Sequence, residues 1–196
     1  MLCLGSMVFG INYKKIKPHQ LIWAGFVLAL ILFVICIISR PESLGHNDGL
    51  SYFGAVWWTV VPYSVAFLSY GTFCWLASNK VPDKSRSAKF IKWFLRLMAI
   101  MLVGLILTPH TVINSVHKTF GSTLFASQLL LSMYLFYKNP KQFYVFILII
   151  IMFASGLFSA AFLFSSAGFM IQAQIIYQFA FVVLVTHYLK ILNKLK

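Results

Sequence analysis

The stretch Ser-Arg-Pro-Glu-Ser-Leu-Gly-His-Asn-Asp-Gly, residues 39–49, separates the first two long apolar runs of the chain. It contains two of the three acidic residues of the protein, Glu42 and Asp48. Proline and glycine at this density end helices and favour turns. The flanking apolar runs, 21–38 and 52–77, are close to or above the roughly 20 residues that a membrane-spanning helix needs. The stretch is therefore expected to lie outside a bilayer, between two spanning helices.

The composition of the whole chain is typical of a polytopic membrane protein. Of its 196 residues, 61% are hydrophobic and only 10% are charged, whereas soluble domains carry roughly 25% charged residues. The net charge of +13 lies in short clusters between apolar runs, which is typical of residues that flank spans. No nucleic-acid partner is expected. The three widely spaced cysteines predict neither a disulfide framework nor a thiol redox site.

Four further apolar runs follow the first two, at residues 90–107, 119–137, 143–164 and 170–189. The fold class predicted from them is an all-α membrane protein, a single domain over residues 1–196 with six transmembrane helices in one bundle. Pro62 falls inside the second run, where it predicts a kink. An even number of spans places both termini on the same side of the membrane.

Basic residues set the expected orientation of the six spans. Fourteen lysines and arginines lie on the side of the termini, and only Arg40 and Lys118 lie on the other. Cytoplasmic loops carry the excess of basic residues in membrane proteins. Both termini are therefore expected in the cytoplasm, with tryptophans near both interfaces, and membrane lipids are the expected surroundings and partners.

Polar residues gather in the loops expected on the outer face, and we take them as candidates for a ligand-binding site: Arg40, Glu42, His46, Asp48, His110, Asn114, His117 and Lys118. Several are ligand types for a divalent metal or for acid–base chemistry. However, two histidines seven residues apart on one helix lie about 10 Å apart, too far for one zinc ion. No metal and no cofactor is therefore predicted, and hydrated interfacial groups are the simpler interpretation.

His117 is the candidate with the clearest ligand chemistry, because it precedes the fourth span, where free N–H groups favour anions. Lys118 adjoins it and Arg40 is expected to approach from the first outer loop. An anionic headgroup would fit such a spot. A salt bridge with Glu42 or Asp48 that closes the mouth of the bundle is the alternative.

The last span carries glutamines, of which Gln174 and Gln178 are four residues apart and share one helical face. Because a glutamine that faces lipid has no hydrogen-bond partner, both are expected to point into the bundle. They are interpreted as interhelical contacts or as the lining of a polar cavity.

Several short motifs resemble a known group of proteins. Leu44-Gly45 follows span one, Phe53-Gly54 enters span two, Leu107-Thr-Pro109 closes span three, and His117 precedes Phe120-Gly121-Ser-Thr-Leu-Phe125. This pattern resembles the six-helix bacterial and archaeal membrane proteins related to the FRAG and DRAM proteins. The resemblance implies a six-helix fold, a bacterial or archaeal plasma membrane and, from eukaryotic relatives, a link to lipid or glycolipid handling. Ser43 stands where that pattern has an aspartate.

Three functions remain open at this point. The first is a non-enzymatic membrane protein whose outer mouth recognises a lipid headgroup or a small molecule. The second is the substrate-binding subunit of a vitamin-type transporter, which is also a six-helix protein of this size. The third is a membrane-embedded metal-dependent hydrolase built on Glu42, His46, Asp48, His110 and His117. The sequence favours a protein that is not an enzyme.

Overall fold

The computed structural model describes residues 15–83, 85–109, 111–140, 142–162 and 168–194, and the regular structure in these ranges is helical. The helices are α1 (Pro18–Ser39), η2 (Pro41–Gly45), η3 (Gly49–Ser51), α2 (Tyr52–Ala55), α3 (Val60–Lys80), α4 (Arg86–Leu107), α5 (Asn114–Lys138), α6 (Phe143–Phe162) and α7 (Met170–Lys194). The predicted all-helical class is therefore confirmed for the described residues.

Five of these helices, α1, α3, α4, α5 and α7, are long and apolar enough to cross a membrane. Many of their large apolar side chains point outward; Ile31 and Ile38 on α1 are 53% and 75% exposed. Such a surface is too apolar for water. The helices therefore indicate an integral membrane protein. The described part of α6 contains a shorter apolar helix, Phe143–Ser159.

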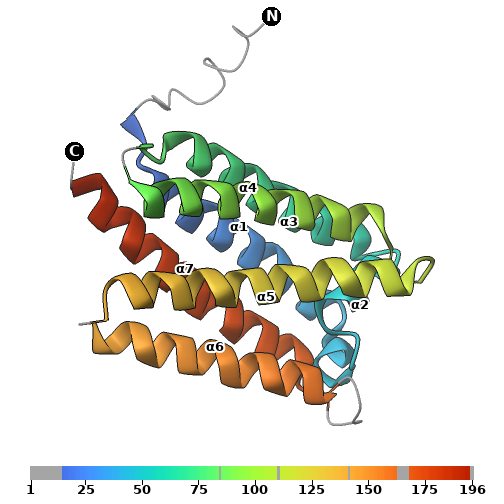
Figure 1. Ribbon diagram of the computed structural model, residues 1–196. Coiled ribbons are helices and arrows are strands. Elements are labelled where there is room, and N and C mark those ends of the chain that lie inside the picture. Colours follow the sequence, from blue (N-terminus) through green and yellow to red (C-terminus); the bar gives the residue numbers. More distant parts are fainter. Residues whose placement is uncertain (1–14, 84, 110, 141, 163–167, 195–196) are drawn as a thin grey trace, which may run out of the picture.

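The six long helices pack as a closed ring in chain order (Figure 1). Each contacts the next, α7 contacts α1, and α7 also contacts α5. One end of the bundle contains the start of α1, the end of α7 and the α3–α4 and α5–α6 turns. We call it the terminal end. The opposite end is covered by residues 41–55, which include η2, η3 and α2. We call this segment the roof, and the end that it covers the roof end.

Some helix boundaries in the structure differ from the predicted span boundaries. The second span begins at Val60 rather than Tyr52, because residues 52–55 form the separate helix α2. Pro62 then lies in the first turn of α3, where no intrahelical N–H bond is lost, so it requires no kink. The fourth span begins earlier, at Asn114. The N-terminal residues 1–14 and residues 163–164 of the fifth predicted span lie outside the described residues.

Polar side chains inside the bundle are paired across helices. The amides of Gln128 on α5 and Gln178 on α7 bond reciprocally, with nitrogen–oxygen distances of 3.1 and 3.0 Å. The Tyr177 hydroxyl donates to the Phe125 carbonyl at 2.6 Å. The prediction that Gln174 and Gln178 point into the bundle is confirmed, since both bond to neighbouring segments and Gln174 is only 9% exposed. These bonds fasten α7 to α5.

The reciprocal amide pair yields a prediction about stability. Gln128→Leu or Gln178→Leu alone should lower the free energy of unfolding by about 1–2 kcal/mol, because each leaves the partner amide unpaired in an apolar interior. The double substitution should recover most of that loss. Thermal unfolding of the four proteins in one detergent measures this cycle. Additive losses in the double variant would show that the two amides do not act as a pair.

Candidate ligand cavity at the roof end

A cavity of about 420 Å³ lies inside the bundle at its roof end. Every long helix and the roof contribute to its lining, which comprises Phe26, Ala29, Leu30, Phe33, Asn47, Asp48, Leu50, Ser51, Tyr63, Phe67, Tyr70, Leu102, Leu105, His117, Lys118, Gly121, Ser122, Leu124, Phe125, Gly156, Ser159, Met170, Gln174, Ile175 and Gln178. Ligand pockets in proteins typically occupy roughly 300–1,000 Å³. The cavity is therefore large enough for a small organic molecule.

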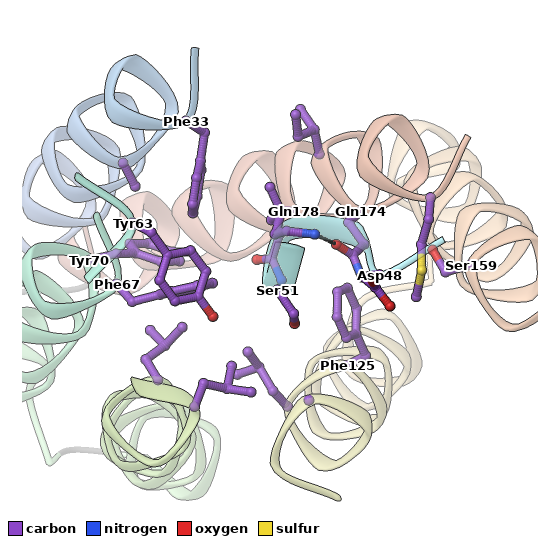
Figure 2. Close-up of a pocket in the computed structure, with 18 of the residues that line it drawn as sticks. Phe33, Asp48, Ser51, Tyr63, Phe67, Tyr70, Phe125, Ser159, Gln174 and Gln178 are labelled. Atoms are coloured by element: carbon purple, nitrogen blue, oxygen red, sulfur yellow. Dashed lines mark hydrogen bonds between the residues drawn. The ribbon is translucent and has the colours of Figure 1, made fainter. Parts of the chain in front are cut away.

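The cavity has two chemically different sides (Figure 2). Helices α1 and α3 supply an aromatic side in which Phe33 and Phe67 meet edge to face at 5.4 Å between ring centroids, and Tyr63 and Phe67 at 4.8 Å. On the opposite side, α6, α7 and the roof supply polar groups, including those of Asp48 and Gln174. An occupant that contacts both sides has to be amphipathic.

The roof is held over the cavity by hydrogen bonds to α7 and to the residues just before it. The Leu50 N–H donates to Gln174 Oε1 at 2.9 Å, and both groups are buried. The Gly168 N–H donates to Asn47 Oδ1 at 3.2 Å. Gly49 has a φ of +59°, and a Cβ there would lie 2.6 Å from Gln174 Oε1. Glycine is thus required at Gly49 both for the backbone conformation and for space.

His117 fastens the start of α5 to two neighbouring segments. Its Nδ1 lies 2.6 Å from the Thr108 carbonyl oxygen, and its Nε2 lies 2.7 Å from Ser51 Oγ. Since a carbonyl only accepts, Nδ1 carries the proton and donates, so that in the neutral ring Nε2 accepts from the Ser51 hydroxyl. His117 is only 4% exposed. It therefore links the roof, α5 and the end of α4, and this structural role accounts for both ring nitrogens.

The structure brings together five of the ten residues predicted for a ligand site. Asp48, His117, Lys118, Gln174 and Gln178 line the cavity. Four others, Arg40, Glu42, His46 and Asn114, are absent from its lining, and His110 lies outside the described residues. Because Lys118 lines the cavity and Arg40 does not, the cavity does not bring these two cations together as expected.

Arg40 instead bonds within its own loop, to Glu42 at 3.2 Å. Hydrogen bonding to the Glu42 backbone, followed by that to Arg40, lowers the pKa of the exposed Glu42 carboxyl below its usual value. His46 stacks on Tyr52 with ring centroids 4.5 Å apart. These three residues therefore shape the outer surface of the roof. Within the described ranges, no group of three histidine, cysteine or acidic side chains is placed to hold a metal ion.

The sequence interpretation missed the aromatic side of the cavity. Phe26 and Phe33 on α1 are seven residues apart, as are Tyr63 and Tyr70 on α3. This spacing places each pair on one helical face. The signal was present, but in a chain with this many aromatic residues the same spacing is typical of ordinary core packing.

No protein family, curated protein or solved structure matches this chain.

His117 yields a prediction that separates a structural from a ligand-binding role. His117→Ala should lower the free energy of unfolding by about 2–3 kcal/mol, because the Thr108 carbonyl and the Ser51 hydroxyl each lose a partner in a partly buried site. The neighbouring substitution Lys118→Ala should leave stability nearly unchanged, since Lys118 is exposed. Thermal unfolding compares the two. Equal melting temperatures for His117→Ala and the unmodified protein would refute the structural role.

Proposed function

We propose that this protein is a six-span membrane protein with both termini in the cytoplasm, and that its cavity binds a small amphipathic molecule that enters from the outer side. The observation that carries the proposal is the division of the cavity into an aromatic and a polar side. An apolar pocket with a few converging polar groups is the usual form of a small-molecule site. The proposal agrees with the link to lipid or glycolipid handling that the resemblance to the FRAG- and DRAM-related proteins implies from their eukaryotic relatives.

The orientation is supported by where the charged residues lie in the fold. The terminal end carries the basic α3–α4 turn, where Lys92 bonds Asp83 at 2.8 Å and Arg96 bonds Asn79 at 3.1 Å. At the roof end, the described loops and the start of α5 contain four charged residues, which are Arg40, Glu42, Asp48 and Lys118. Their charges sum to zero. This asymmetry is that of a membrane protein whose termini are cytoplasmic.

The sixth span is α6. Its described part is apolar, and it packs along α7. Its outward-facing side chains Phe153, Leu157 and Phe158 are 55%, 56% and 59% exposed. Lipid is a favourable environment for such a surface, whereas water is not.

A second function shares the same cavity: the substrate-binding subunit of a small-molecule transporter. The lining favours this function, because every long helix contributes residues to it and rearrangement of any helix would alter the cavity. Co-purification with a pair of ATPase subunits from the native host distinguishes this function from binding alone.

The orientation is tested by cysteine labelling in intact cells, in a Cys3→Ser background, since Cys36 and Cys74 are buried. Gly45→Cys should react with an impermeant maleimide, because a Cβ at Gly45 meets nothing within 4 Å. Lys89→Cys, exposed at the terminal end, should react only after the cells are opened. The reverse pattern would place the cavity on the cytoplasmic side.

The cavity is tested by filling it. A Cβ at Gly121 would meet only Leu105, at 3.8 Å, so the larger side chain of Gly121→Leu should extend into the cavity. Protein purified in mild detergent should carry an amphipathic small molecule that mass spectrometry detects, and Gly121→Leu should lose it. Ala126→Leu is the matched control, because Ala126 lies on the same helix, is exposed and does not line the cavity. Equal amounts of bound molecule in both variants would count against the cavity as the site.

A further inference from the structure

We propose that the outward surface of α3 and α4, at the terminal end, binds one anionic phospholipid. Its phosphate lies against Lys89, Lys92 and Arg96, and its acyl chains extend along both helices toward the roof end. This site lies at the opposite end of the bundle from the cavity and does not rest on the proposed function.

One outward face of α4 is basic at the terminal end and apolar toward the roof end. Residues three or four positions apart are neighbours on a helix, so the following residues form one stripe: Lys89, Lys92, Arg96, Ile100, Val103 and Leu107. The three apolar members are 55%, 39% and 72% exposed. Along the helix axis, the stripe therefore matches an anionic headgroup followed by an acyl chain.

Helix α3 continues the same surface beside α4 (Figure 1). Its outward side chains Val61, Val65 and Leu68 are 66%, 45% and 46% exposed. Trp75 of α3 and Trp93 of α4 are also exposed, close to the basic part of the stripe. Tryptophan is enriched where the headgroups meet the hydrocarbon. Two helices thus offer apolar surface next to the basic cluster, as the two acyl chains of a phospholipid require.

Arg96 is held at the level where α3 ends. Its Nε donates to Ser78 Oγ at 3.4 Å and its Nη2 to Asn79 Oδ1 at 3.1 Å, both in the last turn of α3. The guanidinium carbon lies 5.5 Å from the centroid of the Trp75 ring. A guanidinium has five N–H groups, of which these bonds use two. Arg96 is therefore positioned by neutral partners and keeps donors for an anion.

The charges around Arg96 are not balanced by the protein. Two of the three acidic residues of the chain lie in the roof, and the third, Asp83, accepts from Lys92 Nζ at 2.8 and 3.1 Å. That bond lowers the pKa of the Asp83 carboxyl, and the charges of Lys89 and Arg96 add to the effect. Three cations thus surround one carboxylate, which leaves a net charge of +2 among these four side chains. An anionic lipid phosphate complements this charge at a membrane surface.

The test titrates dioleoyl phosphatidylglycerol or dioleoyl phosphatidylcholine into the full-length protein in a neutral detergent, and native mass spectrometry counts the bound lipids. The two lipids have the same chains and differ in net charge. One phosphatidylglycerol should bind roughly fivefold or more tightly than phosphatidylcholine. Arg96→Gln should weaken phosphatidylglycerol about five- to tenfold and leave phosphatidylcholine unchanged.

Two further variants keep the test decisive if Arg96→Gln does not fold. Lys89 is exposed, and its side chain makes no hydrogen bond within the described residues, so Lys89→Gln should fold and weaken phosphatidylglycerol about two- to fivefold. Lys138→Gln is the matched control. Lys138 also lies at the terminal end, against the rings of Tyr134 and Tyr137, but it belongs to α5. Its substitution should leave phosphatidylglycerol binding unchanged.

Three results would overturn the inference. Equal affinities for the two lipids, or equal weakening by Lys89→Gln and Lys138→Gln, would show general attraction to a basic surface instead of one site. Displacement of the lipid by glycerol phosphate at the same concentration would show a phosphate site that does not use the acyl chains. If Gly121→Leu loses phosphatidylglycerol while Arg96→Gln and Lys89→Gln retain it, the lipid occupies the cavity, so this inference falls and the proposed function stands.

Discussion

The arrangement of the roof end depends on one buried hydrogen bond, from the Leu50 backbone N–H to Gln174. The roof is made of short 3₁₀ and α-helical turns, which leave backbone groups without partners of their own. In an apolar interior each such group costs free energy unless a side chain satisfies it. Gln174 meets this need at Leu50, and the contact fixes the position of Gly49. The bond therefore holds the roof against α7, above the cavity.

The polar residues of the bundle have two different uses, although the sequence does not distinguish them. Gln128 and Gln178 satisfy each other, and His117 satisfies Thr108 and Ser51. Gln174 and Lys118 also line the cavity, where a guest would meet them. The same residue types therefore serve as structural contacts in one place and as candidate ligand contacts a few ångströms away. Only the list of partners separates the two roles.

Much of the fold could be predicted from the sequence, because apolar runs and charge clusters are local patterns. The helices around 21–38, 90–107 and 170–189 lie where hydropathy placed them. The break between α2 and α3 was missed, since residues 52–59 are as apolar as a span. The turn at Val56 to Thr59 is held by a local bond from Thr59 to the Phe53 carbonyl and by a tertiary contact, from the Cys36 thiol to the Thr59 carbonyl. For Arg40 the sequence left two partners open, an anionic guest shared with Lys118 or a salt bridge with Glu42 or Asp48, and the structure contains the pair with Glu42, which is near in sequence.

The bonds that hold the roof join residues that are far apart along the chain. Leu50 and Gln174 are separated by 124 positions, Asn47 and Gly168 by 121, and Gln172 and Leu44 by 128. Domains form their contacts progressively as the chain is synthesised, and contacts between distant segments form late. The roof therefore acquires these partners only after α3, α4, α5 and α6 have been synthesised and α7 follows. The roof end of the cavity is therefore complete only when α7 is in place.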